Sequence, residues 1–344
     1  MSYSVVVQAA GGGAIGVGHL SRTATLANAL RSTGFWKRVV LLWETSPELA
    51  AYFQPPECEV IIVPDSQTAL RERSRLCKQQ GIFILVTDLL NIQAEDVAVA
   101  KNQGYQAFVH VNDSGIGRFA ADMLVDADAF KSLKDLPPSF KGVGLIGAPY
   151  RIIRPSVAQL RPLTPWLGDK VNKVLISLGG SDPGNITLQL VQSLYEQQLL
   201  PSFSTTIVVG PAFDSTQVNQ LQIIVEQNQY LSIIKSPSSL AHLILEHDLI
   251  VTLGGITSYE IMCMGKPCAA VAWGSMKYYV EHLNSISLLA NLGEVKNAVN
   301  CLLKLTNNIG LLHQLAKLGW KKIDGRGADR IATQISNLAN TLLM

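Results

Sequence analysis

The sequence predicts an α/β protein made of two doubly wound, Rossmann-like domains. Short runs rich in β-branched residues alternate with longer amphipathic stretches, which is typical of strand–helix–strand repetition. Several of the short runs are apolar throughout, as expected for parallel strands that helices cover on both faces. With 344 residues, 48% of them hydrophobic, the chain is long enough for two domains with their own cores.

Ten runs are expected to be strands, and they fall into two series. The first series is Tyr3–Gln8, Arg38–Trp43, Glu59–Val63, Ile82–Val86 and Ala107–Val111. The second series is Lys173–Leu178, Thr205–Val209, Leu231–Ile234, Leu249–Leu253 and Ala269–Ala272. Helical patterns fill the gaps, for example Leu20–Ser32, Thr187–Gln197 and Thr257–Met264.

A segment of linker composition, containing Pro155, Pro162 and Pro165, separates the two series. We therefore expect a first domain at 1–154, a linker at 155–170 and a second domain at 171–322. A helix at 323–344 can cross back to the first domain. In open α/β sheets ligands bind at the carboxyl ends of the strands, so the two domains are expected to face each other across a ligand-binding cleft.

Composition excludes several classes of protein. Lys and Arg total 28 against 26 for Asp and Glu, so no basic excess favours nucleic acid as a partner. The one basic cluster, Arg71 to Lys78, is interpreted as a solvated helix face rather than a membrane contact. The five cysteines form no CxxC pair, no apolar run approaches 18 residues, and no Lys or Arg precedes Arg22. We expect a cytoplasmic protein with no integral membrane segment.

A glycine-rich segment, Gly11 to Arg22, directly follows the first expected strand. Its glycines permit positive φ angles and let a ligand approach the backbone. A helix is expected to start near His19, where the positive end of the helix dipole disfavours a charged imidazole. An uncharged histidine in a cleft suits a general base, and a histidine that only caps or packs the helix is the alternative.

The same segment partly matches the dinucleotide-binding pattern G-x-G-x-x-G through Gly11, Gly13 and Gly16, with Glu44 as the ribose contact. Helical periodicity begins only after Gly18, and Glu44 follows Gly16 by 28 positions rather than about 20. A nicotinamide oxidoreductase is therefore a weaker rival interpretation.

A second motif, Gly254 to Glu260, follows the strand Leu249–Leu253 and opens a helix. The N–H groups of Ile256 to Ser258 are expected to bind a phosphate or diphosphate, with the Thr257 or Ser258 hydroxyl as a further donor. Glu260 lies one turn into the helix, where its carboxylate suits the vicinal hydroxyls of a ribose. A capping arrangement without ligand is the alternative.

Other candidates also follow strands. The turn Gly179–Asn185 either lines the cleft or is a tight connection capped by Asp182 or Asn185. Asp88, and the pair Asn112 and Asp113, either orient sugar hydroxyls, polarise His19 or cap helices. His242 and His247 are five positions apart with no carboxylate cluster, so no metal site is expected.

Taken together, these segments resemble the nucleotide-sugar hydrolases of the pseudaminic-acid pathway and the related spore-coat polysaccharide proteins. The match covers nearly the whole chain and keeps the family's order. The matching segments are Ile15–Arg22 with Leu26-Ala27, Ala121–Asp126, Gly147–Arg154, Leu178–Asn185, Gly254–Glu260 with Gly265-Lys266-Pro267, and Asp324–Ala328.

This resemblance implies the GT-B architecture and similarity to the peptidoglycan N-acetylglucosaminyl transferase. It implies a UDP-linked amino sugar as substrate. No cofactor is expected, and no metal ion is expected because two helix starts that bind a diphosphate can replace a metal ion as counter-charge. The family's catalytic histidine maps to His19, which would activate water to attack the anomeric carbon, and Glu260 maps to the ribose contact. The residues expected to bind the substrate or its nucleotide are Gly16, Gly18, Arg22, Asp88, Gly180, Ser181, Gly254, Gly255, Ile256, Thr257, Ser258 and Glu260.

Two departures from the family pattern keep alternatives open. Asn112-Asp113 stands where the family has two aspartates, and Glu281-His282-Leu283 stands where it has Glu-Asn-Gln. The expected function is metal-independent hydrolysis of a nucleotide sugar in surface-polysaccharide or nonulosonic-acid-type biosynthesis. A GT-B glycosyltransferase and a non-catalytic nucleotide-sugar-binding homologue are the alternatives, and the oligomeric state is left open.

Overall fold

The computed structural model describes residues 3–12, 15–55, 57–79, 82–111, 114–182, 184–197, 202–237 and 239–342. Gly13, Ala14, Asn112, Asp113 and Pro183, which belong to motifs discussed above, lie outside these ranges. The chain divides into two compact units. The first unit contains residues 1–154 and 325–344, and the second contains residues 155–324.

The first unit is built on a parallel sheet whose strand order is β3-β2-β1-β4-β5-β6-β7. Because β1 pairs with both β2 and β4, the direction in which the chain winds reverses between β1 and β4. The strands are β1 (Tyr3–Ala10), β2 (Arg38–Glu44), β3 (Glu59–Val63), β4 (Ile82–Asp88), β5 (Ala107–His110), β6 (Met123–Asp126) and β7 (Val143–Ile146).

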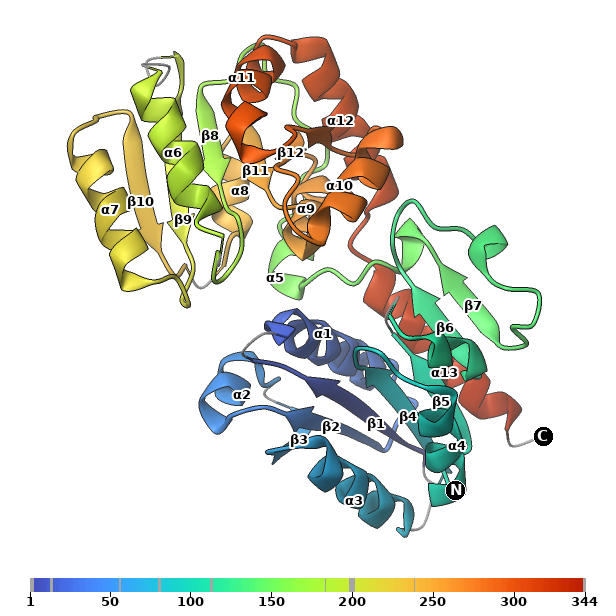
Figure 1. Cartoon of the computed structure of the whole chain (residues 1–344). Helices are drawn as coiled ribbons and strands as arrows, with labels where there is room; N and C mark the ends of the chain where they lie inside the picture. Colours follow the sequence, from blue (N-terminus) through green and yellow to red (C-terminus); the bar gives the residue numbers. More distant parts are fainter. Residues whose placement is uncertain are drawn as a thin grey trace. The chain divides into compact units, whose positions relative to one another are not determined.

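Helices cover both faces of this sheet, which explains its uniformly apolar strands (Figure 1). Those of the first unit are α1 (Gly18–Ser32), α2 (Pro47–Phe53), α3 (Ser66–Cys77), α4 (Ala94–Gln103) and α13 (Gly327–Thr341), with short 3-10 turns η2 (Ile116–Ala120), η3 (Leu133–Asp135) and η4 (Ala148–Tyr150). Side chains of α1 and α13 pack on the face that presents Val5, Ile84 and Val109. Those of α3 and α4 pack on the opposite face, with Val6 and Leu85.

The basic cluster Arg71 to Lys78, expected to be a solvated helix face, lies in and just after helix α3. Arg71, Arg75 and Lys78 are exposed, as a solvated face requires, but Arg73 is buried at 6% exposure. It lies on the same side of the helix as the buried residues Ala69 and Leu76, at the spacing of one helical face. The expectation of a fully solvated cluster was wrong for Arg73, because helical spacing places it toward the sheet.

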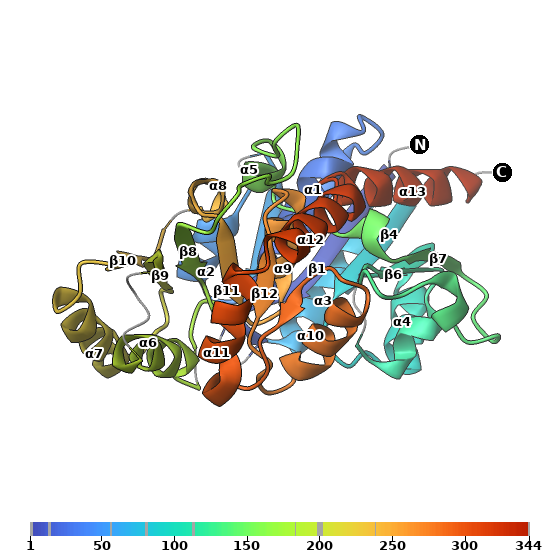
Figure 2. The same cartoon turned by 90° about the horizontal axis from the view of Figure 1, so that it is seen from above.

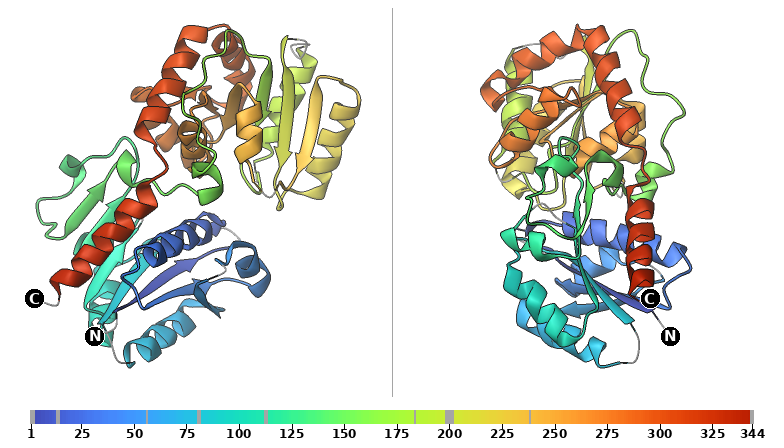
Figure 3. Two further views of the ribbon diagram at one scale, coloured as in Figure 1. Left: turned by 180° about the vertical axis from the view of Figure 1, so that it is seen from behind. Right: turned by 90° about the vertical axis from the view of Figure 1, so that its right-hand side faces the viewer.

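The C-terminal helix α13 belongs to the first unit and lies beside α1 (Figures 2 and 3). Its first residue, Gly327, meets the turn η4 so closely that a Cβ there would lie 2.1 Å from the Arg151 carbonyl oxygen. Arg330 Nη1 donates to the Pro149 carbonyl oxygen at 3.0 Å. The motifs 147–154 and 324–328 therefore meet in space, and the glycine permits their contact.

The second unit repeats the architecture with the strand order β10-β9-β8-β11-β12-β13, again parallel. Its strands are β8 (Lys173–Ile176), β9 (Ser204–Val209), β10 (Leu231–Lys235), β11 (Leu249–Thr252), β12 (Cys268–Ala270) and β13 (Ala290–Asn291). Its helices are α5 (Pro155–Ala158), α6 (Ile186–Glu196), α7 (Ser215–Glu226), α8 (Ala241–Glu246), α9 (Ile256–Cys263), α10 (Met276–Ser285), α11 (Val295–Thr306) and α12 (Ile309–Lys322). Helices α6 and α7 lie on one face of the sheet, whereas α8 lies on the other (Figures 1 and 3).

Residues 155–170, expected to be a linker, are part of the second unit. The buried side chain of Trp166 belongs to its core and donates through Nε1 to Asp248 Oδ1 at 3.1 Å. Arg161 Nη2 donates to the Trp320 carbonyl oxygen at 2.6 Å, and its guanidinium lies over the Trp320 ring. These side-chain contacts hold residues 155–170 against the second unit. The prolines in the segment gave no indication of such contacts.

All ten expected strands are present, with ends that differ by at most a few residues. The strands β6, β7 and β13 were not expected. Asp126 ends the apolar run of β6, a glycine interrupts that of β7, and β13 is only two residues long, so they lack the extended apolar run that reveals the others.

Replacing Gly327 with alanine should destabilise the protein by about 1–3 kcal/mol, because the new methyl group collides with a backbone oxygen. Gly310 in α12 is the matched control, since a Cβ added there would lie 3.9 Å from its nearest neighbour, Asn308 Oδ1. Gly310→Ala should be neutral or stabilising by up to about 1 kcal/mol. Calorimetric melting of both variants checks this, and equal stability would show that the close contact is unimportant.

Candidate active site

In the first unit the candidate residues gather where the winding direction reverses. The glycine-rich segment follows β1, and Asp88 ends β4, the neighbouring strand in which Asp88 pairs with Ala9. His19 is the second residue of α1, whose start lies at the same edge of the sheet. Ligand sites of open α/β sheets lie at this position.

Asp88, His19 and Arg22 form one hydrogen-bonded group. His19 Nδ1 lies 2.8 Å from Asp88 Oδ1. Arg22 donates to the same carboxylate in a bidentate manner, from Nε to Oδ2 at 2.6 Å and from Nη2 to Oδ1 at 2.6 Å. The Asp88 side chain is fully buried, whereas those of His19 and Arg22 are 14% and 17% exposed. The carboxylate therefore forms the inner side of the group, and the imidazole faces outward.

These contacts fix which nitrogen of His19 carries the proton. An ionised carboxylate only accepts hydrogen bonds, so Nδ1 must donate its N–H to Asp88. Arg22 Nη2 also lies 3.1 Å from Nδ1, but it cannot donate there if that nitrogen holds a proton, and its hydrogen bond to Asp88 is shorter. In the uncharged ring, Nε2 then carries the lone pair. An outward-facing Nε2 lone pair is what a general base requires.

The Asp88 carboxyl group is held in its ionised form. Complete burial alone would raise its pKa, but the Arg22 charge and the hydrogen bonds from His19 and Arg22 outweigh burial and hold the pKa well below its usual value. Asp88 was expected to orient sugar hydroxyls, to polarise His19 or to cap a helix. The structure pairs it with His19.

The glycines before His19 shape the turn that brings it to Asp88. Gly12 and Gly16 have φ angles of +114° and +77°, and the Gly12 N–H donates to the Gly16 carbonyl at 2.8 Å. Gly11 packs against Leu20, where a Cβ would lie only 2.4 Å from the leucine Cγ. Gly18 begins α1. Glu44, the ribose contact of the rival dinucleotide interpretation, instead accepts a hydrogen bond from Gln8 Nε2 at 2.8 Å.

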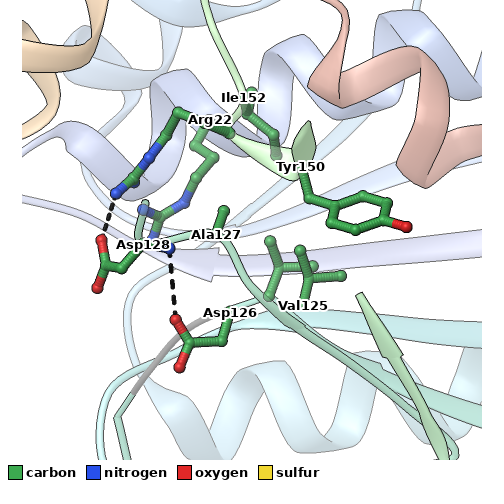
Figure 4. Close-up of a pocket in the computed structure, with 9 residues that line it drawn as sticks. Arg22, Val125, Asp126, Ala127, Asp128, Tyr150 and Ile152 are labelled. Carbon is green, nitrogen blue, oxygen red and sulfur yellow. Dashed lines mark hydrogen bonds and ion pairs between the residues drawn. The ribbon is translucent and has the colours of Figure 1, made fainter. Parts of the chain in front are cut away.

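Arg22 also lines a small pocket beside this group (Figure 4). Asp126 and Asp128 lie at its charged end, Arg151 forms an ion pair with Asp128, and the Tyr150 ring points away from the carboxylates. The pocket volume is about 40 Å³, enough for a few water molecules but not for a sugar ring. The segments 121–126 and 147–154 therefore supply charged surroundings for Arg22.

In the second unit two glycine turns follow adjacent strands at the corresponding reversal. Gly179 to Ser181 follow β8, Gly254 and Gly255 follow β11, and these two strands pair with each other. Gly179 and Gly254 have φ angles of +113° and +90°. Both turns thus lie at the position where parallel sheets bind ligands.

The start of α9 differs from expectation at two residues. The Ser258 N–H donates to the Gly255 carbonyl at 3.0 Å, so it is not a free donor. Gly255 caps the helix without a side chain, which leaves Ile256 and Thr257 with the outward N–H groups of a helix start. Ser258 and Glu260 are buried, at 0% and 1% exposure, so the Glu260 carboxylate is not open to a ribose in this structure.

The N-terminus of α6 is capped by the chain itself. Asp182 Oδ1 accepts from the Ile186 N–H at 2.9 Å, and Oδ2 accepts from the Thr187 N–H at 2.7 Å and from Gln217 Nε2 at 2.8 Å. The turn Gly179–Asn185 is therefore a connection capped by Asp182, as the alternative interpretation expected. Its first three residues, Gly179 to Ser181, are exposed and available to a ligand.

The altered segment Glu281-His282-Leu283 lies on α10. Glu281 is exposed, Leu283 is fully buried, and the His282 ring contacts the Tyr278 ring with centroids 4.1 Å apart and planes tilted by 42°. Among the described residues, no three histidine, cysteine or acidic side chains gather as a metal ion would need. Within those same ranges, no helix has both the length and the apolar character to cross a membrane.

One residue beside Asp88 was not identified from the sequence. His110 ends β5 with its side chain completely buried, and its Nδ1 lies 2.9 Å from the hydroxyl of Thr87, the neighbour of Asp88. Burial lowers the pKa of His110 to about 4. The signal available in the sequence was a histidine at the end of an apolar run, directly before Val111 and Asn112.

Comparison with known proteins identifies the fold. A putative UDP-N-acetylglucosamine 2-epimerase from Listeria monocytogenes matches with a TM-score of 0.67 and 12% identity, over 98% of this chain and 97% of its own. MurG from Acinetobacter baumannii also matches with a TM-score of 0.67 and 16% identity, over 97% and 99%. The protein has the GT-B fold of two parallel-sheet α/β units, as the sequence predicted.

Among curated proteins, the spore coat polysaccharide biosynthesis protein SpsG of Bacillus subtilis is 22% identical over 346 residues, covering 97% of this chain and 98% of SpsG. The uncharacterized protein MJ1062 of Methanocaldococcus jannaschii is 23% identical over 281 residues, covering 79% of this chain. The chain spans only 57% of the length of MJ1062. No protein-family profile matches the sequence.

Stability should depend on pH through His110. Its pKa is about 4 when folded and about 6.5 when unfolded, so the unfolded chain binds more protons between these values. His110 therefore contributes stability that is complete above about pH 6.5 and is lost as the pH falls toward 4, at up to about 1.4 kcal/mol per pH unit.

Urea unfolding of the protein and of His110→Gln across this range measures the contribution, because the difference between the two cancels the other titrating groups. The variant should lose less stability on acidification. Parallel pH profiles would contradict the burial of an uncharged His110.

Proposed function

We propose that this protein hydrolyses a UDP-linked amino sugar at its anomeric carbon and releases UDP, in surface-polysaccharide or nonulosonic-acid-type sugar biosynthesis. The observation that carries the proposal is the Asp88-held imidazole of His19, whose Nε2 faces outward from the winding reversal of the first sheet. The similarity to SpsG, named for spore coat polysaccharide biosynthesis, supports the biosynthetic setting. The match to a putative UDP-N-acetylglucosamine 2-epimerase supports the class of substrate.

In the proposed reaction, His19 Nε2 removes a proton from a water molecule. The water oxygen forms a bond to the anomeric carbon, and the bond between that carbon and the β-phosphate oxygen breaks. The electron pair leaves with UDP. Asp88 stabilises the imidazolium that forms, and Arg22 keeps Asp88 ionised and in place.

The second unit is proposed to bind the diphosphate through Gly179–Ser181 and the N–H groups of Ile256 and Thr257. Helix N-termini and glycine turns present N–H donors and a positive dipole to anions. The leaving UDP gains negative charge as the glycosidic bond breaks, so the same donors stabilise it. The proposed reaction uses no metal ion.

His19→Ala should lower hydrolysis of UDP-linked amino sugars by about 10²–10⁴-fold, the usual contribution of a general base, and leave UDP affinity unchanged. His242→Ala is the control, because His242 is exposed in the second unit. Release of free sugar and UDP is measured without an acceptor. Turnover only after a sugar or lipid hydroxyl is added would indicate a transferase, and unchanged turnover in His19→Ala would contradict the role of His19.

Ile256→Pro should weaken UDP binding by about 10–100-fold, because it deletes one N–H donor to a charged group. Proline is tolerated at the first helical position, and the extended backbone of Gly255 suits a residue before proline. Ser215→Pro makes the same change at the start of α7 and should leave UDP affinity as it was. Calorimetric titration with UDP compares them, and equal affinities would show that the α9 amides do not bind phosphate.

A further inference from the structure

A second, larger pocket lies on the other face of the first unit's sheet. Its volume is about 270 Å³, and its lining includes Gln8 of β1 and Thr87 of β4, which pair across the winding reversal. Thr87 and Asp88 are consecutive in a strand, so their side chains point to opposite faces. The pocket is therefore separated from the His19 group by the sheet itself.

The inner wall of the pocket is buried and polar, whereas its mouth is exposed. Gln8 and Arg73 are 3% and 6% exposed. Ser66, Gln67 and Leu90 at the mouth are exposed. A ligand entering from solvent would reach buried polar groups, which is the usual construction of a small-molecule site.

Arg73 is short of partners in this wall. Its Nη1 donates to Gln8 Oε1 at 3.3 Å, and Gln8 Nε2 donates to Glu44 Oε1 at 2.8 Å, so the amide connects the two charged groups. Arg73 Nε is buried and has no hydrogen-bond partner among the described residues. Within those residues no carboxylate lies within 4.0 Å of the Arg73 guanidinium. A buried cation without full hydrogen bonding is costly, and a ligand oxygen would relieve that cost.

The charges, hydrogen-bonding groups and apolar side chains that line the pocket indicate the class of ligand that it can bind. Arg73 is its one cation and is outnumbered by Glu44 and Asp96, so an anion is disfavoured. Gln8, Ser66 and Gln67 both donate and accept hydrogen bonds, as sugar hydroxyls do. Leu70, Leu89 and Phe108 supply apolar surface for the carbon face of a ring.

We propose that this pocket binds a neutral saccharide ring, with a hydroxyl or acetamido oxygen on Arg73. The saccharide is either a free sugar or the glycosyl group of a nucleotide sugar other than the one that reacts at His19, because the sheet lies between this pocket and the His19 group. The site does not rest on the proposed hydrolysis, because its test is the binding of a free sugar.

Saturation-transfer NMR with free N-acetylglucosamine tests the site. Arg73→Met should weaken binding by about 10–100-fold, the effect of losing hydrogen bonds to a charged group. Replacing a buried, poorly paired charge with an apolar side chain is often neutral or stabilising, so the variant is expected to fold. Arg71→Met, on the exposed side of the same helix, is the matched control and should bind as the unmodified protein does.

Competition separates the two sources of the sugar. Displacement by UDP-N-acetylglucosamine but not by UDP would identify the nucleotide-linked glycosyl group, whereas no displacement by either would identify a separate saccharide. Both outcomes keep the site, and His19→Ala should bind the free sugar normally. The proposal is overturned if no saccharide binds, if Arg73→Met binds like the unmodified protein, or if inorganic phosphate rather than the sugar binds in an Arg73-dependent manner.

Discussion

The buried carboxylate of Asp88 determines the arrangement of the first unit's candidate site. A fully buried carboxylate is unfavourable unless its charge and oxygen atoms have partners, and Arg22 and His19 provide them. The same contacts give His19 a defined tautomer and direction. Both partners come from the first two turns of α1, so the connection from β1 to α1 must place that helix where the carboxylate of β4 can be reached. Structural stability and the proposed chemistry therefore depend on one set of contacts.

The second unit uses backbone rather than side-chain groups. Its two glycine turns follow paired strands, and the first N–H groups of α9 have no intrahelical partners. At α6 the corresponding donors are taken by Asp182, so the two helix starts differ in their capacity to bind an anion. The helix N-terminus is thus used for stability in α6, whereas in α9 it is available to a ligand.

The fold and the location of the candidate residues at strand ends were predictable, because apolar runs and glycine turns are local signals. The pairing of His19 with Asp88 was not, since the residues are 69 positions apart and meet only because β4, not β3, lies beside β1. Arg73 was expected to be solvated because it belongs to a cluster of basic residues, but it is buried. Its spacing from Ala69 and Leu76 already indicated the buried face of the helix. The hydrogen bond of the Ser258 N–H and the choice of Asp182 as the cap of α6 depend on backbone geometry, which residue types alone do not determine.

The protonation of His19 is the direct measure of this arrangement. Nitrogen-15 NMR of the isotopically labelled protein distinguishes the two tautomers of an uncharged imidazole by the shifts of Nδ1 and Nε2. The Asp88 contact predicts a proton on Nδ1 and a lone pair on Nε2 for His19. A proton on Nε2 instead would mean that the ring cannot accept a proton from water on its outward side, and the assignment of His19 as the base would fail.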